Sequence, residues 1–179
     1  MKRTNLPVRE IIFGLEDGIV STLGVLVGIA TGTNNKSLVI LSGLVVIFVE
    51  SLSMAAGTYL SNKSQQEIHL AEDKKFPLKS LFHRHKPGLP VKDSAFMGVS
   101  YILGGLVALT SFLILPVGIG VISAVLTSFV FLFTIGFVKG NLAQISSVKS
   151  GLEMVLVSAS ASFIGYIVGK LASTLLTTL

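Results

Sequence analysis

The sequence contains no cysteine and no tryptophan, and it is poor in charge. Without cysteine the chain can form neither a disulfide nor a thiolate metal site. Charged residues make up 13% of the chain, about half of their usual share in globular proteins. A Ser/His/Asp arrangement, a phosphate-binding loop and the HExxH motif are also missing, and all three histidines lie within residues 61–94. We therefore expect a protein that is not an enzyme and that holds no tightly bound cofactor.

Hydrophobic residues, by contrast, account for 51% of the chain and are gathered into long blocks. A helix needs about 20 apolar residues to cross a bilayer. Residues 95–138 carry no charged side chain but are too long for one crossing, and Pro116 supplies a break. We predict an all-α integral membrane protein, a single membrane domain over residues 1–179, with residues 61–94 as a cytoplasmic segment. The five predicted spans are about 11–31, 38–60, 95–115, 119–138 and 152–176.

The basic residues lie between the apolar blocks rather than along one face. Twelve of the 14 precede the first block, fall within residues 61–94 or follow the fourth block, while Lys36 and Lys170 lie on the other side. An excess of Lys and Arg marks the cytoplasmic loops of membrane proteins. We therefore expect a cytoplasmic N-terminus, a C-terminus that is outside or luminal, and no nucleic-acid partner. Glu16 and Asp17 argue that the first block is a retained span and not a signal peptide.

Three acids lie inside the first two predicted spans: Glu16, Asp17 and Glu50. A carboxylate deep in a bilayer costs roughly 2.5–3.5 kcal/mol on insertion scales, so it needs a partner, a proton or an ion. The two spans run in opposite directions, which places Asp17 at the depth of Met54 and Ser21 at the depth of Glu50. Because side chains four apart share a helix face, these two pairs can form a short ladder.

This ladder is our candidate metal site, with Asp17, Glu50, Met54 and Ser21 as ligands. Carboxylates suit hard divalent ions, and a thioether shifts the preference toward Fe²⁺. The alternatives are that Met54 only packs and that the acids stay protonated and bond to nearby hydroxyls. Glu16 lies about 100° round the helix from Asp17, so it either lines the same path or points elsewhere.

Small residues recur at intervals of four in the first, second and fifth predicted spans. Such spacing lets helices approach closely in lipid. The stripe serves either packing inside one subunit or, in the first span, a contact between two copies of the chain. The residues are Gly14, Gly18, Gly24, Gly28, Gly32, Ser53, Gly57, Ala161, Gly165 and Gly169.

Two motifs carry a family resemblance: residues 13–22 (FGLEDGIVST) and residues 51–61 (SLSMAAGTYLS). They resemble the vacuolar iron transporter family of yeast and plants, and residues 150–154 (SGLEM) extend the likeness. The resemblance implies five-helix subunits paired through the first span. It also implies export of Fe²⁺, and often Mn²⁺, from the cytosol in exchange for protons. By motif, Asp17 and Met54 match the positions at which the family contacts the ion.

The sequence departs from the family in two places. Members often have an acid two turns before the methionine, where Val46 stands here, and Glu50 lies one turn before it. Residues 61–94 are also too short for the family's long Glu-rich metal-collecting domain, so we expect a compact member. Glu67 and Glu72 are either a remnant of that domain or a solvated helix surface. His83 and His85 flank Arg84, which disfavours a metal there.

The sequence thus predicts a transporter that exports divalent iron, and manganese, by proton antiport. Its partners would be metal ions, protons, the lipid bilayer and a second copy of the chain. The alternatives are a non-transporting membrane scaffold or regulator that binds metal, and a passive divalent cation channel. The membrane would be a prokaryotic cell membrane or a eukaryotic membrane of vacuolar type.

Overall fold

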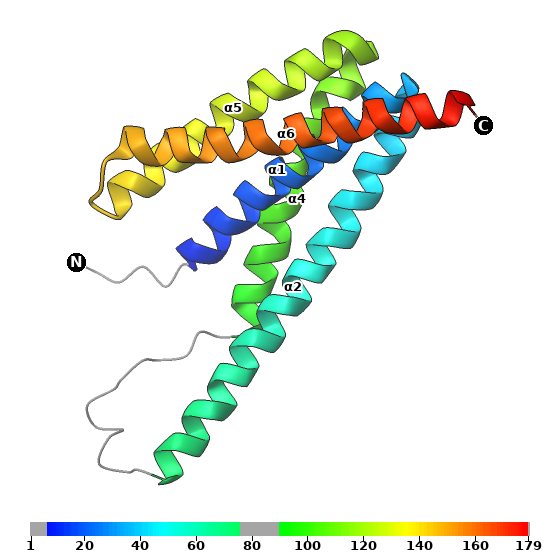
Figure 1. Cartoon of the computed structure of the whole chain (residues 1–179). Coiled ribbons are helices and arrows are strands. Elements are labelled where there is room, and N and C mark those ends of the chain that lie inside the picture. Colours follow the sequence, from blue (N-terminus) through cyan, green and yellow to red (C-terminus); the bar gives the residue numbers. More distant parts are fainter. Residues whose placement is uncertain (1–6, 76–89, 179) are drawn as a thin grey trace.

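A computed structural model of the protein describes residues 7–75 and 90–178, without the side chains of residues 69, 72–75 and 176–178. Every regular element in these ranges is a helix, and five helices are long and apolar enough to cross a membrane (Figure 1). The predicted all-α membrane architecture is therefore confirmed. The helices are α1 (Val8–Thr33), α2 (Lys36–Lys75), α4 (Pro90–Ile114), α5 (Val117–Leu142) and α6 (Ser147–Thr178).

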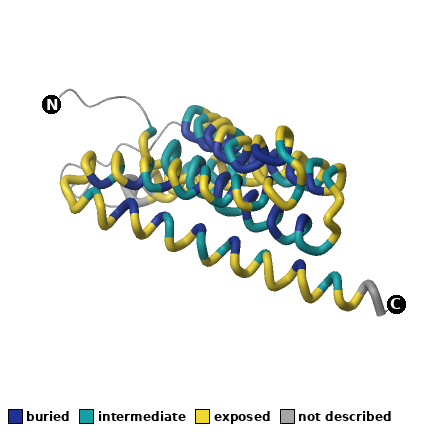
Figure 2. Tube along the Cα trace, turned by 90° about the horizontal axis from the view of Figure 1, so that it is seen from above, coloured by how far each residue is buried: buried dark blue, intermediate teal, exposed yellow. Residues whose placement is uncertain are grey.

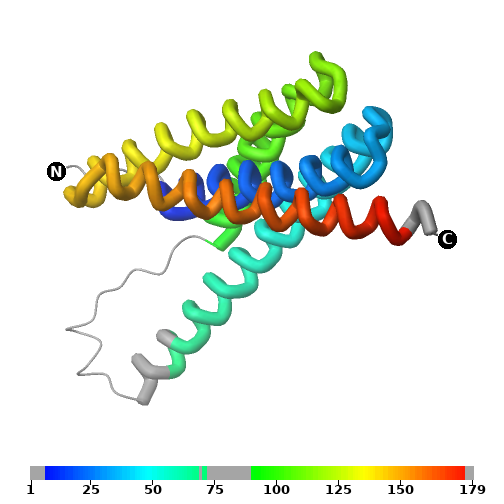
Figure 3. The backbone as a smooth tube through the Cα atoms, turned by 45° about the horizontal axis from the view of Figure 1, so that its top comes forward, coloured from blue at the N-terminus to red at the C-terminus, as the bar shows by residue number. Residues whose placement is uncertain are grey.

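Helix α1 is the centre of the bundle. It packs along α4 and α6 and also touches α2 and α5. Helix α6 runs parallel to α1, so α1 begins and α6 ends at opposite ends of the bundle (Figures 1 and 3). This is the arrangement that an odd number of spans requires. The side of the membrane on which each end lies stays a prediction from the distribution of Lys and Arg.

Two adjacent asparagines make the turn between α1 and α2. Asn34 adopts a left-handed conformation with φ 47°, and its N–H donates to the carbonyl oxygen of Ala30 at 2.9 Å, which closes α1. Asn35 then accepts hydrogen bonds on Oδ1 from the backbone N–H groups of Ser37 and Leu38, at 3.0 and 3.2 Å. Since the first N–H groups of a helix have no partner within it, this side chain starts α2. The short turn keeps α1 and α2 adjacent.

The helices extend beyond the predicted spans. The polar residues 61–75 favour a helical continuation of the second span, and this is confirmed: α2 continues to Lys75, and its end projects past the start of α4 (Figure 1). The prolines and basic residues after residue 75 favour an irregular loop up to the third predicted span at residue 95. For residues 90–94 this prediction is wrong, because α4 begins at Pro90. Proline suits the first position of a helix because its missing N–H would be unpaired there. The break between α4 and α5 is also shorter than predicted, because α5 begins directly after Pro116.

The largest apolar core lies in the half of the bundle away from the start of α1. Its fully buried members include Leu26, Ile47, Leu109 and Phe112, from α1, α2 and α4. A smaller cluster of Ile19, Leu132 and Met154 joins α1 to α5 and α6. The buried residues of α6 lie on the side that faces the other helices, and most of the other residues of α6 are exposed (Figure 2). The acids of α1 and α2 are therefore at the margin of the core and not within it.

The small residues of α1 pack inside the subunit. A Cβ atom on Gly18 would overlap the backbone carbonyl of Tyr101 in α4, and one on Gly165 of α6 would overlap the carbonyl oxygen of Gly24. This confirms internal packing, the first of the two predicted uses. On α2 the outcome differs, because a Cβ on Gly57 would have no neighbour within 4 Å. The small residues of α1 therefore pack against α4 and α6, while Gly24, Gly28 and Gly32 also line an apolar groove between α1 and α6. A contact between subunits at the first span stays a prediction.

Candidate functional site

Two acids from adjacent helices form the centre of the candidate site. Asp17 of α1 is half-buried, and the charged group that acts on it is Glu50 of α2. No lysine or arginine among the described residues contributes to its electrostatic environment. Two carboxylates that face the same space without a cation repel each other when both are ionised. Such a pair needs either protons or an external cation.

The hydroxyl of Tyr101 on α4 completes this group. Its side chain is 1% exposed, and the phenol lies within electrostatic range of both Asp17 and Glu50. Ser21 Oγ donates to the carbonyl oxygen of Asp17 at 2.6 Å and shares a hydrogen bond with the Tyr101 hydroxyl. Because the serine proton is already directed at Asp17, the phenol is the donor to Ser21. Polar side chains of α1 and α4 thus meet here, with Glu50 of α2 within electrostatic range.

Tyr101 is the site residue that sequence reasoning missed. It stands in the charge-free stretch 95–138, which was treated only as apolar. The one available signal was position, since tyrosines of membrane helices are enriched at the two interfaces and not in the middle of a span. Thr22 adds a second buried hydroxyl near the same phenol, and it makes no hydrogen bond of good geometry with any described residue. The hydroxyls of Ser21, Thr22 and Tyr101 are therefore close to one another beside Asp17.

The α2 side of the site is open. Glu50 is exposed, Met54 one turn further is half-buried, and Ser53 is exposed as well. Their apolar neighbour Leu52 is 72% exposed. Met54 shares the helix face of Glu50, so a thioether can reach the same space. Its role as a ligand stays a prediction.

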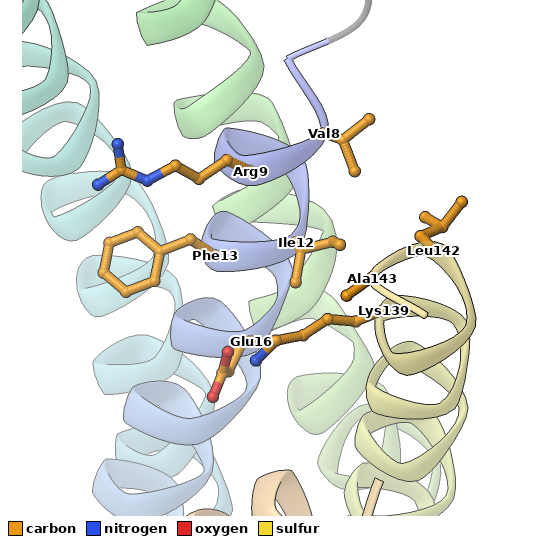
Figure 4. Close-up of a pocket in the computed structure, with 8 residues that line it drawn as sticks. All are labelled: Val8, Arg9, Ile12, Phe13, Glu16, Lys139, Leu142 and Ala143. Atoms are coloured by element: carbon orange, nitrogen blue, oxygen red, sulfur yellow. The ribbon is translucent and has the colours of Figure 1, made fainter. Parts of the chain in front are cut away.

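The third acid, Glu16, has other neighbours. It lines a separate cavity of about 500 Å³ between α1 and the end of α5, where the ammonium of Lys139 reaches toward it (Figure 4). Lys139 and Asp17 are the charged groups that act on Glu16. The cavity walls include Glu16 but neither Asp17 nor Glu50. Whether Glu16 also belongs to the metal path stays a prediction.

The outer candidates are far less enclosed. Glu67 on the projecting part of α2 is exposed and lies 4.0 Å from Lys63, one turn earlier on the same helix. Exposed pairs of this kind are usually worth less than about 1 kcal/mol. The side chain of Glu72 and both His83 and His85 lie outside the described residues. For Glu67 the solvated helix surface is therefore the simpler description.

The donor set of one subunit is small. The described residues contain no group of three or more His, Cys, Asp or Glu side chains that could hold a metal ion. An ion between Asp17 and Glu50 would have to complete its shell with Met54, with hydroxyl or carbonyl oxygens, with water, or with the same groups of a second subunit. A partial shell suits an ion that is bound and then released more than one that is held permanently.

The chain is similar to known proteins over most of its length. The sequence matches the VIT family over residues 8–77 and 75–170, that is, over most of the chain. It is 29% identical to vacuolar iron transporter homolog 2 of Oryza sativa subsp. japonica, with 94% of this chain and 92% of the relative aligned. It is 22% identical to vacuolar iron transporter 1 of Arabidopsis thaliana, with 91% of this chain and 85% of the relative aligned.

A third relative, an uncharacterized protein of Methanocaldococcus jannaschii, is 24% identical over 90% of this chain and 88% of its own length. The Arabidopsis alignment spans 213 positions against the 179 residues of this chain, so that relative contains inserted segments. The two matched segments of the family meet at residues 75–77, where the described part of α2 ends. This is the place at which a compact chain would lack an inserted domain.

Proposed function

The chain belongs to the VIT family, and on this basis we propose that it transports divalent iron, and also Mn²⁺, out of the cytosol in exchange for protons. Iron transport is the activity in the names of its relatives. The observation that carries the proposal for this chain is the pair Asp17 and Glu50. Both acids lie in helices that can cross a membrane, and no described cation acts on Asp17.

Exchange with protons follows from the cost of charge in the bilayer. With a divalent ion bound, the two carboxylates are ionised and neutralised by the metal. Without it, two ionised groups facing each other in a medium of low polarity would be strongly unfavourable. The empty site therefore returns with protons on its acids, and those protons leave when the next ion binds. Ser21 and Tyr101 hold the backbone of α1 in place beside the site throughout this cycle.

A homodimer is part of the proposal. A single subunit leaves Glu50 exposed on a face that otherwise consists of apolar and small residues such as Val49, Leu52 and Ala56. In a bilayer that face would put a carboxylate against acyl chains. A second copy placed on it would enclose Glu50 and double the donor set to two Asp, two Glu and two Met. The contact would then involve α2 together with the open side of α1 near Phe13.

Transport by purified protein in proteoliposomes tests this function. We expect Fe²⁺ or Mn²⁺ flux coupled to proton movement in the opposite direction, and a loss of at least about tenfold in the Asp17→Asn and Glu50→Gln variants, because each keeps the shape of the side chain but not its charge. Glu153→Gln is the control, since this acid is exposed on α6. Metal binding without flux would indicate a scaffold, and flux without proton movement would indicate a channel. Either result would contradict the proposed antiport.

A further inference from the structure

The cavity beside Glu16 is built differently from the space between Asp17 and Glu50. Its walls are mostly apolar, from Val8, Ile12, Phe13, Leu142 and Ala143. Three charged side chains line it as well: Arg9, Glu16 and Lys139. Figure 4 shows Arg9 directed to the other side of α1, whereas the Lys139 side chain extends across the cavity toward the Glu16 carboxylate. The acid therefore has one basic neighbour here.

The two charged groups, Glu16 and Lys139, come from separate helices, α1 and α5. Glu16 is the ninth residue of α1, about 12 Å along the helix axis from Val8. Lys139 is in the last turn of α5 and is half-buried. A lysine at a helix end in a membrane usually extends toward the headgroups. Lys139 points inward instead, and Glu16 is the acid that it reaches (Figure 4).

The gap between them is wide enough to leave the carboxylate available. Lys139 and Glu16 do not form an ion pair within 4.0 Å, so they attract each other across the cavity without direct contact. In surroundings of low polarity such an attraction is still substantial. A divalent cation that arrives at Glu16 would meet the ammonium first and would have to displace it.

From this geometry we propose that Lys139 is a tethered countercharge for Glu16 at the mouth of the metal path, displaced by each incoming ion and returned when that ion moves on. The proposal rests on the transport function proposed above. It assigns Lys139 as a positioning residue that competes with metal for the Glu16 carboxylate and so weakens metal binding there. The mouth would then pass ions to Asp17 and Glu50 rather than retain them.

Mn²⁺ binding to the purified full-length chain, followed by electron paramagnetic resonance, tests the proposal. We expect Lys139→Met to tighten Mn²⁺ binding about tenfold, because the built-in competitor is gone. In proteoliposomes the same variant should lower both KM and the maximal rate, since ions held more tightly at the mouth leave it more slowly. A role in packing alone would not tighten metal binding. Lys139→Arg keeps the charge and should behave like the unmodified chain.

Two further variants make the outcome specific. Lys149→Met removes an exposed lysine at the same end of the bundle, and it should leave Mn²⁺ affinity unchanged. Combining Glu16→Gln with Lys139→Met should abolish the tenfold gain, because the gain requires the carboxylate. Circular dichroism confirms that each variant is folded before binding is measured.

The possible failures are distinct. If the unmodified chain binds Mn²⁺ and Lys139→Met binds it with the same affinity, the countercharge is overturned and the transport function stands. An equal gain in Mn²⁺ affinity in Lys149→Met would also overturn the countercharge, because removal of any lysine at this end of the bundle would then have the same effect. If Lys139→Met instead loses a bound anionic lipid while its Mn²⁺ affinity is unchanged, the cavity is a headgroup site and the proposal is wrong. If no form of the protein binds Mn²⁺ or transports it, the proposed function fails and the countercharge with it.

Discussion

Asp17 and Glu16 are neighbours in the sequence, yet their surroundings give them opposite chemistry. Glu16 faces a lysine across a cavity, and Asp17 faces a second acid. An acid beside a lysine has a countercharge within the subunit, whereas an acid beside another acid does not. Rotation by about 100° along one helix is enough to produce this difference. Asp17 is therefore the acid for which we propose an external cation.

The hydroxyl of Tyr101 leads to a prediction about a single residue. Tyr101→Phe keeps the ring in the core but removes the hydroxyl that bonds to Ser21. We expect the transport rate to fall roughly fivefold, which corresponds to about 1 kcal/mol for one buried hydrogen bond. The melting behaviour should change little, since the ring contributes most of the buried area. Initial rates of Mn²⁺ uptake into proteoliposomes measure the effect.

The matched control for this change is Tyr166→Phe. Tyr166 is exposed on α6, and its ring lies 6.0 Å from the ammonium of Lys170, a contact that phenylalanine preserves. This variant should transport at the native rate. Unchanged transport by Tyr101→Phe as well would show that its hydroxyl is not part of the site.

How far the site was predictable depends on where each partner lies in the chain. Asp17 and Glu50 stood out from the sequence because acids are rare in apolar blocks. Tyr101 did not, because its meaning comes from Ser21, 80 residues away, and that pairing exists only after α4 has packed on α1. The division of Glu16 from Asp17 was likewise undecided until Lys139 had been placed beside one of them. The sequence alone therefore identified the acidic side chains of the site but not the residues that pack beside them in the fold.

At the scale of the elements, the apolar blocks predicted the five helices but not their ends. Local chemistry that hydropathy does not register determines those ends. Asn34 closes α1, Pro90 opens α4, and the polar part of α2 continues the helix well past the apolar block. The spacing of small residues predicted close packing, but it could not name α4 and α6 as the partners of α1.

The contact between α1 and α6 yields a prediction of its own. Gly165→Ala would place a Cβ atom against the carbonyl oxygen of Gly24, and neither backbone can yield without separating the helices. We expect the free energy of unfolding to fall by ~1–3 kcal/mol, which is typical of overpacking, although alanine is a better helix former than glycine. A lower apparent midpoint of thermal unfolding, followed by circular dichroism, would report this loss. The method suits a chain without tryptophan.

Gly118→Ala is the comparison for that experiment. It makes the same substitution in α5, where a Cβ has nothing within 4 Å. Stability there should be unchanged or slightly higher. If both variants melt at the native temperature, α1 and α6 do not approach as closely as the structure has them.

At the scale of the whole molecule, one face of the subunit remains to be explained. Toward the end of α2, Ser53, Met54 and Gly57 continue the face of Glu50, and none of them is buried within the subunit, whereas Ile47, one turn before Glu50, is fully buried. A carboxylate on a lipid-facing surface is unfavourable. A second copy of the chain that covers this face removes the cost and brings two acid pairs together. The proposed two-fold arrangement would thus serve stability and metal binding at once.

The absence of native cysteine makes this arrangement directly testable. Ser53→Cys places one thiol on the proposed interface, and Leu126→Cys places one on the exposed surface of α5. In membranes we expect oxidation to yield a covalent dimer of Ser53→Cys but not of Leu126→Cys, because a disulfide forms only when the two Cα atoms lie about 4.4–6.8 Å apart. A short bis-maleimide would capture a slightly wider separation. If neither reagent links Ser53→Cys, Glu50 is not enclosed by a second α2, and the ion would have to complete its coordination within one subunit.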